Sequence, residues 1–206
     1  MLNIALPKGR LGSDVYKLFA AIGCECPSIL EDNRKLIFTN EDAGVRYFWV
    51  KPVDVATYVE HGAADIGVVG KDVLMENEPD IYELLDLQRG CCRVVTAAPA
   101  GYIEDQSLPL RVATKYPHIA AKFYAGQNRI IELIRLGGSM ELAPLAGLSD
   151  VIVDIVETGS TLKENNLQVT QVIATSSARL IANKSSYKFK GEKIDRLVGK
   201  MKEILK

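Results

Sequence analysis

Short apolar runs alternate along the chain with segments whose apolar residues recur every three or four positions. Residues 2–6 form the first apolar run, and Val15, Leu18 and Ile22 then recur at helical spacing after Ser13, which is expected to cap that helix. The apolar runs indicate strands, and the amphipathic segments between them indicate helices. This alternation is typical of a parallel α/β architecture.

The same pattern predicts the remaining elements. Further strands are expected at 35–40, 44–50, 66–69, 81–87, 91–98, 111–116, 129–135 and 150–156, with amphipathic segments among them. Residues 169–184 are long and strand-like and are expected to carry the chain back to its first part. Residues 190–206 then form a terminal amphipathic helix.

Prolines, a glycine and polar residues gather at 99–110, which we interpret as a crossing between two lobes. The predicted first lobe is discontinuous and comprises residues 1–99 and 172–206, and the second lobe comprises residues 100–171. The predicted fold is therefore two α/β lobes around a central cleft, the architecture of periplasmic binding proteins.

Composition narrows the class of protein. The chain has 206 residues, of which 48% are hydrophobic and 25% charged, and its net charge is −1, as in ordinary globular proteins. Nothing in this charge points to nucleic acid or a membrane surface as a partner. The apolar start is too short for a signal peptide, and no run is long enough to span a membrane, so we expect the cytoplasm.

Cysteine and histidine usage argues against several chemistries. Cys24, Cys26, Cys91 and Cys92 lack the C-x₂-C spacing of a structural zinc site, and we expect reduced, mostly buried thiols. With only two histidines in the chain, neither a Ser-His-Asp triad nor a histidine-rich metal site is expected. We therefore predict no metal site built from protein ligands.

The most informative stretch is VIVDIVETGSTL at 151–162. Its strand is apolar on both faces, with Asp154 near the carboxyl end, where ligands bind in open α/β sheets. The following turn at Thr158–Thr161 offers hydroxyls and the amides of a helix start to a phosphate. Carboxylates instead accept hydrogen bonds from hydroxyl groups. Asp154 and Glu157 therefore suit a sugar whose phosphate the turn binds, although capping of the next helix is an alternative.

Several motifs in the same order resemble one enzyme family. DIVETGSTL at 154–162 is similar to the phosphoribosyl pyrophosphate (PRPP) loop of ATP phosphoribosyltransferases. The further motifs that resemble this family are LPKGRL at 6–11, VEHGAADIGVVGKDVL at 59–74, VATKYPHIA at 112–120 and GSMELAPLAGLSDVIVD at 138–154. Together they span nearly the whole chain.

The resemblance implies transfer of the phosphoribosyl group of PRPP to N1 of the adenine of ATP, with release of pyrophosphate, as the first step of histidine biosynthesis. It implies that Asp154 and Glu157 hold the ribose hydroxyls. The residues implied for the 5-phosphate are Thr158, Gly159, Ser160 and Thr161. Mg²⁺ is expected to arrive with PRPP or pyrophosphate rather than in a protein cage.

Pyrophosphate and ATP require cations. Lys8, the backbone at Gly9, and Arg10 follow the first strand and stand at a helix start, which favours an anion, although a solvated basic turn is the alternative. With Asp154 and Glu157, Lys8 and Arg10 complete the expected catalytic set. Arg34 and Lys51 are further candidates. Many family members have arginine in place of Lys51, so this chain provides a point charge without the bidentate fork.

The turn GSMELAP resembles the family's second-lobe turn near the nucleotide. Gly138 and Ser139 are expected to begin a helix, and Glu141 to lie in its first turn. An ordinary N-cap, with Glu141 favouring the helix dipole, is the alternative.

The chain resembles the short form of the family, which implies a homodimeric core joined by a regulatory subunit related to histidyl-tRNA synthetase. Two other functions are compatible with a two-lobed fold. One is a non-catalytic small-anion binding or sensor module, and the other is a nucleobase-salvage phosphoribosyltransferase. The pair of acids before a phosphate-binding turn argues against a sensor. The companion motifs PKGR and GSMELAP argue against a salvage enzyme.

Overall fold

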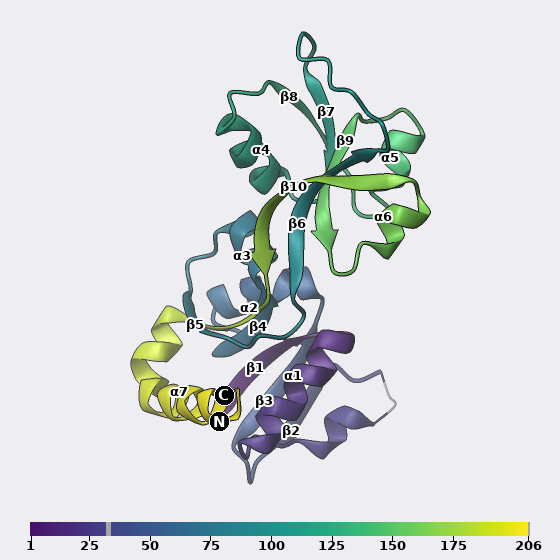
Figure 1. Cartoon of the computed structure of the whole chain (residues 1–206). Coiled ribbons are helices and arrows are strands. Elements are labelled where there is room, and N and C mark those ends of the chain that lie inside the picture. Colours follow the sequence, from purple (N-terminus) through teal and green to yellow (C-terminus); the bar gives the residue numbers. More distant parts are fainter. Residues whose placement is uncertain (32–33, 206) are drawn as a thin grey trace. The chain divides into compact units, whose positions relative to one another are not determined.

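The computed structural model describes residues 1–31 and 34–205, and these form two compact α/β units (Figure 1). The first unit comprises the described part of residues 1–74, residues 78–90 and residues 177–205. The second unit comprises residues 75–77 and 91–176. Each unit is built on one sheet with helices on both faces. Two α/β units were predicted, and this is confirmed.

The first unit contains a six-stranded sheet in the order β2-β3-β1-β4-β11-β5. Its strands are β1 (Leu2–Pro7), β2 (Ile37–Asn40), β3 (Val45–Val50), β4 (Ile66–Gly70), β5 (Tyr82–Asp86) and β11 (Ala178–Ala182). β1 runs parallel to both β3 and β4, whereas β2, β11 and β5 pair antiparallel with their neighbours. The parallel centre explains why these strands are apolar on both faces.

Two apolar clusters cover the two faces of this sheet. On one face pack α1 (Arg10–Ala21), the 3₁₀ turn η1 (Pro27–Leu30) and α7 (Lys184–Ile204), and on the other α2 (Val55–Glu60) and α3 (Lys71–Asn77), with η2 (Pro52–Asp54) leading into α2. Side chains alternate along each strand, so Leu180 points to the first cluster and Ile181 to the second.

The second unit contains a five-stranded sheet in the order β10-β6-β9-β7-β8. The strands are β6 (Cys92–Pro99), β7 (Leu110–Thr114), β8 (Ile131–Arg135), β9 (Val151–Val156) and β10 (Leu167–Ser176). The helices are α4 (Pro117–Ala125) on one face, and α5 (Leu142–Leu145) and α6 (Ser160–Glu164) on the other (Figure 1). β9 is central, parallel to β7 and antiparallel to β6.

Two features of the organisation differ from the prediction. The sheets are mixed rather than parallel, because β10 pairs antiparallel with β6 and β11 pairs antiparallel with β4. The unit boundaries also lie elsewhere than at 99/100 and 171/172. Residues 92–99 form β6, whose hydrogen bonds go to β9 and β10 of the second sheet, so the chain changes units before this strand. Of the segment 99–110, residues 100–109 form a loop within the second unit, and its two ends belong to β6 and β7.

The burial of the four cysteines differs from the prediction. All four cysteines are free thiols, but only Cys26 is buried, whereas Cys91 is exposed and the other two are half-buried. The expectation of mostly buried thiols is therefore wrong, because the adjacent pair lies where the chain passes between sheets.

Among the described helices, none has the length and apolarity needed to cross a membrane.

A buried ion pair fastens α7 to the first sheet. Asp65 is 4% exposed, and both of its carboxylate oxygens lie 2.8 Å from Nζ of Lys190. The same carboxylate accepts a hydrogen bond from the backbone N–H of Asn3. Burial by itself raises the pKa of Asp65, but the hydrogen bonds from Asn3 and Lys190 outweigh it and lower the pKa. These contacts give Asp65 a structural role.

Replacing Lys190 by methionine is expected to lower the free energy of unfolding by about 2–3 kcal/mol, because it leaves a buried carboxylate without its cation. We expect this modest loss, rather than that of a fully buried ion pair, because the Lys190 side chain is 37% exposed. A carboxyl with a lowered native pKa stabilises the fold above its ordinary pKa, and this contribution is lost as the pH falls through the native value. Urea unfolding at pH 7 and pH 3 should therefore show the difference between wild type and Lys190→Met shrinking in acid.

Candidate functional site

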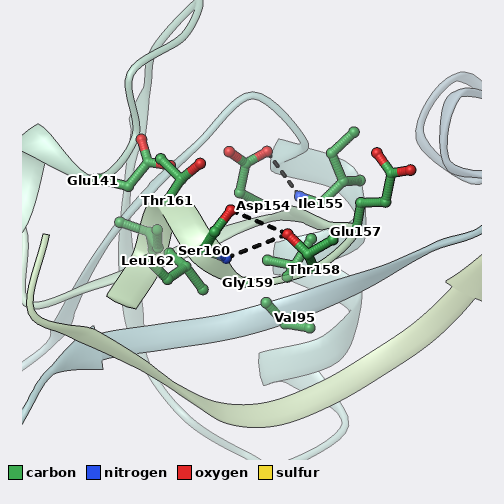
Figure 2. A pocket seen from close by; sticks show the side chains of 12 residues that line it. Val95, Glu141, Asp154, Ile155, Glu157, Thr158, Gly159, Ser160, Thr161 and Leu162 are labelled. Atoms are coloured by element: carbon green, nitrogen blue, oxygen red, sulfur yellow. Dashed lines mark hydrogen bonds between the residues drawn. The ribbon is translucent and has the colours of Figure 1, made fainter. Parts of the chain in front are cut away.

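A cavity of about 240 Å³ lies where β9 ends and α6 begins (Figure 2). Its lining includes three carboxylates, from Glu141, Asp154 and Glu157, and the whole turn 158–161. In Figure 2 these carboxylates point to the same side of the pocket, and the hydroxyl-bearing turn lies among them. The structure thus brings together the acids and the turn that the sequence singled out.

The alternation of side chains along β9 sets the position of Asp154. Val151 and Val153 pack in the cluster beneath α4, whereas Ile152 and Val156 pack in the cluster beneath α5 and α6. Asp154 lies between the latter two along the strand and therefore emerges on the face of α5 and α6, as its place in the sequence predicts. The apolar residues around it anchor the strand, so the carboxylate is held by the sheet rather than by a loop.

The turn after β9 is shaped by a glycine and two hydroxyls. Gly159 has φ 84° and ψ 4°, a left-handed conformation that favours glycine, and it precedes the first residue of α6. The hydroxyls of Thr158 and Ser160 lie 3.1 Å apart, and the backbone N–H of Ser160 points to Oγ1 of Thr158 at 3.4 Å. Thr158, Ser160 and Thr161 are exposed, so their hydroxyls are accessible to a ligand in the pocket.

The surroundings of Asp154 raise its pKa above the ordinary aspartate value. Its side chain is 17% exposed, and burial raises its pKa above the usual value, while Lys115 and the backbone N–H of Ile155 act in the opposite direction. Nζ of Lys115 lies 3.4 Å from Oδ1 of Asp154, and Ile155 donates to the same oxygen at 2.8 Å. Sequence reasoning missed Lys115. Its one local signal was its place near the end of the predicted strand 111–116, whose observed counterpart β7 ends at Thr114.

The basic turn PKGR is in the first unit, at the end of β1. α1 begins at Arg10, and Gly9 precedes it with φ 104°. The predicted start of a helix at this turn is therefore confirmed, but Ser13 does not cap it, because the helix begins one turn earlier. Lys8 and Gly9 line a second cavity of about 360 Å³, together with the half-buried Trp49.

Three predicted cations do not line either of these two cavities. Arg10 is exposed in the first turn of α1, Arg34 is exposed before β2, and Lys51 is exposed before η2. All three belong to the first unit. The structure therefore places them in the same unit as Lys8, outside the linings of these two cavities.

The turn at 138–141 differs from the prediction. α5 begins only at Leu142, with Glu141 at its N-cap position, so Gly138 and Ser139 do not begin the helix. Ser139 has φ 53°, and its carbonyl accepts a hydrogen bond from the N–H of Leu142. The glycines before it delay the helix because they favour a bend. Glu141 lines the cavity of β9, whereas Gly138 and Ser139 do not.

No group of three or more His, Cys, Asp or Glu side chains within residues 1–31 and 34–205 is arranged to hold a metal ion. The three carboxylates of the pocket therefore do not form a cage. They face a space that also contains hydroxyl groups, which suits a polyhydroxylated ligand.

An α/β unit with acids at the carboxyl end of its central strand, followed by a glycine- and hydroxyl-rich turn, has the features of a phosphorylated-sugar site. The fold and these features fit the class of phosphoribosyl-transferring enzymes. The family model described as ATP phosphoribosyltransferase matches residues 51–203. The chain belongs to the ATP phosphoribosyltransferase family.

Relatives match the chain over its full length. It is 59% identical to an ATP phosphoribosyltransferase of Brachyspira hyodysenteriae, with 100% of both chains covered. It is 48% identical to one of Caldanaerobacter subterraneus, covering 100% of this chain and 98% of the relative. These matches confirm the family that the motifs indicated, and with it the pentosyl-transferring enzyme class.

Solved structures extend the comparison. The chain resembles one in the ATP phosphoribosyl transferase (HisG:HisZ) complex from Thermotoga maritima, with TM-score 0.88, 38% identity, and 100% and 98% of the two chains covered. The alkanesulfonate-binding protein SsuA of Xanthomonas axonopodis resembles it with TM-score 0.61 and 12% identity, covering 98% of this chain and 72% of that one. The second likeness concerns the fold alone and agrees with the predicted binding-protein-like architecture.

Proposed function

We propose that this chain transfers the phosphoribosyl group of PRPP to N1 of the adenine of ATP, releasing pyrophosphate, in the first step of histidine biosynthesis. The observation that carries the proposal is the cavity at the end of β9, in which Asp154 and Glu157 adjoin the turn 158–161. The two carboxylates accept hydrogen bonds from the ribose hydroxyls, and the turn binds the 5-phosphate through its hydroxyls and amides.

The chemical step is a substitution at C1 of the ribose. The lone pair of adenine N1 forms the new C–N bond as the bond from C1 to the pyrophosphate oxygen breaks, and positive charge develops on the ribosyl centre. Carboxylates fixed beside the ribose stabilise that charge, because their orientation is set before the reaction. No proton has to leave N1 before attack, so the reaction does not require a general base. Positioning of the two substrates supplies the rest of the catalysis.

The leaving group and the nucleotide need cations. We assign pyrophosphate and ATP contacts to Lys8, the backbone at Gly9, and Arg10, on the basis of their place at the start of α1. Arg34 and Lys51 are the further candidates. On the second unit, Glu141 stands at the cavity wall, and we assign it, with Gly138 and Ser139 on the loop before it, as a further contact to pyrophosphate or ATP.

Mg²⁺ is assigned to the substrates. Magnesium prefers oxygen ligands and keeps several waters, and it is commonly held by phosphates together with one or two carboxylates. The pyrophosphate of PRPP meets that need, and a carboxylate of the cavity is available as an additional ligand. When bound, the ion neutralises charge on the departing pyrophosphate.

The proposal is tested by incubating the purified chain, with its partner subunit present and absent, with PRPP, Mg²⁺ and ATP, and following adduct formation by ultraviolet absorbance. Adenine and hypoxanthine as acceptors are the matched controls. Product from ATP and none from the free bases supports the proposal. Product from a free base, or PRPP binding without any turnover in the presence of the partner, contradicts it.

We also propose a homodimeric core that joins a regulatory subunit related to histidyl-tRNA synthetase, as a HisG:HisZ complex is described for the Thermotoga maritima protein. Histidine inhibition is then a property of the hetero-oligomer. Histidine added to the isolated chain should leave the initial rate unchanged, and it should lower the rate once the partner is present. Strong inhibition of the isolated chain would contradict this assignment.

A further inference from the structure

We propose that Lys115 is a positioning residue for the phosphoribosyl transfer: its ammonium group holds the Asp154 carboxylate ionised and oriented toward the ribose. The inference rests on the proposed function, since it assigns a helper to a residue of that site. It concerns a side chain outside the cavity lining, which acts on the ligand only through Asp154.

The sheet itself brings the two residues together. β7 and β9 are parallel neighbours, and Thr114 is the register partner of Val153. Lys115 follows Thr114 directly, and Asp154 follows Val153 directly. Ile152 and Ala113 both pack on the face of α5 and α6, and alternation along each strand places Asp154 and Lys115, two residues further on, toward the same face. Their proximity therefore follows from the strand register.

Neighbouring groups fix each end of the pair. Nζ of Lys115 lies 3.4 Å from Oδ1 of Asp154 and 5.1 Å from the centre of the Tyr116 ring, which is itself 5% exposed in the core. Ile155 donates its backbone N–H to the same carboxylate oxygen at 2.8 Å. These two donors occupy Oδ1 of Asp154. Its Oδ2 can therefore accept a hydrogen bond from a hydroxyl group of the ligand.

The charges around Asp154 explain why it needs a cation. Burial disfavours its ionised form, and the carboxylate of Glu141 on the α5 side acts in the same direction. Glu157, from the same turn, lines the cavity as a third acid. Lys115 is the cation whose charge opposes them, together with the N–H of Ile155. Without it, burial and the neighbouring acid favour a protonated Asp154, which is a poorer acceptor.

Replacing Lys115 by methionine removes the charge and keeps the length of the side chain. The titration of the Asp154 carboxyl carbon can be followed by NMR, with its signal assigned by its absence in Asp154→Asn. The midpoint is expected at higher pH in Lys115→Met than in wild type. Lys115→Arg should behave as wild type, and so should Lys122→Met, which removes an exposed lysine of α4. An unchanged midpoint in Lys115→Met overturns the proposal.

Kinetics provide the second measurement. In Lys115→Met the value of kcat/KM for PRPP at pH 7 is expected to fall about threefold to tenfold, and the acid limb of its pH profile to move to higher pH. KM for ATP should not change. In the Asp154→Asn background the same substitution should have little further effect, because its target is already neutral. Equal losses in both backgrounds would show that Lys115 acts independently of Asp154, and they overturn the proposal.

The two measurements separate this inference from the function on which it rests. The NMR titration needs no substrate, so a fixed midpoint rejects Lys115 even in an enzyme that uses PRPP through Asp154. Full PRPP-dependent activity of Asp154→Asn instead rejects the ribose assignment, and the role of Lys115 with it. Lys115→Gln takes the place of the methionine variant if the latter fails to give the wild-type circular dichroism spectrum.

Discussion

Asp154→Asn is expected to lower kcat/KM for PRPP by about tenfold to a hundredfold without weakening the fold. The substitution keeps the shape of the side chain but removes the charge that strengthens its hydrogen bonds to the ribose. A hydrogen bond to a charged group contributes about 1.5–3 kcal/mol, which corresponds to this range. Stabilisation of the ribosyl cation is lost at the same time, so kcat should fall as well as KM rise.

Stability should respond in the opposite direction from activity. Burial raises the pKa of Asp154 in the folded chain, so the folded chain binds this proton more tightly than the unfolded chain does. The stability linked to the protonated carboxyl is complete below the ordinary aspartate pKa and is lost as the pH rises through the raised one. At pH 7 the ionised group therefore destabilises the fold, and Asp154→Asn should melt at the wild-type temperature or above it.

The matched control is Glu164→Gln, which neutralises an exposed acid at the end of α6 outside the cavity lining. Its kcat/KM for PRPP should equal that of wild type. Glu157→Gln should reproduce the loss seen at Asp154. Wild-type kinetics at limiting PRPP in both cavity variants would show that the ribose binds elsewhere.

Gly12→Ala is expected to lower the free energy of unfolding by at least about 3 kcal/mol, a large effect for one methyl group. Gly12 is buried in α1, where an added Cβ would lie 1.8 Å from the carbonyl oxygen of Pro7 and 2.6 Å from the Trp49 ring. The carbonyl cannot retreat easily, because Pro7 is paired with Val50 in the sheet. The helix would have to shift away from the sheet instead.

That shift has a second consequence. The apolar face of α1, including Val15 and Phe19, packs in the core beneath the sheet, so displacing the helix opens gaps there. It also moves Lys8 and Gly9, which connect β1 to α1. Under conditions in which the variant remains folded, KM for both ATP and PRPP should rise, since Lys8 and Gly9 are assigned to the nucleotide and to the pyrophosphate group of PRPP.

Gly199→Ala is the matched control for this substitution. Gly199 is also a helical glycine, in α7, but an added Cβ meets nothing within 4 Å. Alanine there should stabilise the chain by about 0.5–1 kcal/mol through the lower entropy of its unfolded state. Thermal unfolding of the two variants beside wild type gives the comparison. Equal stability of both would contradict the close packing of α1 on β1.

The pattern of apolar residues predicted most of the elements correctly but not their partners. The hairpin of β2 and β3, the strand at 66–69 and the terminal helix could all be read locally. The assignment of residues 92–99 to the second sheet could not be predicted locally. The residues of a strand do not determine which neighbouring strands it pairs with. The loop 99–110 had the composition of a linker, yet loops within a unit use the same residues.

The candidate site shows the same division. The stretch 151–162 places Asp154, Glu157 and the turn 158–161 together because they are contiguous, so the period of the strand and the glycine were enough to expect them in one pocket. The turn before α5 was predicted less well. Whether Ser139 or Glu141 takes the N-cap position of that helix depends on backbone angles that glycines leave open.

By itself, the sequence determined the two-unit α/β class, the family, and the acids and hydroxyls of the proposed ribose-phosphate pocket, since these depend on local periodicity and on motifs in order. Only the tertiary structure decided that β6 belongs to the second sheet, that Asp65 pairs with Lys190, and that Lys115 faces Asp154. Those relations join residues far apart in the chain. They are set by strand register and by burial. Both depend on many side chains that are far apart in the chain, so no short segment determines them.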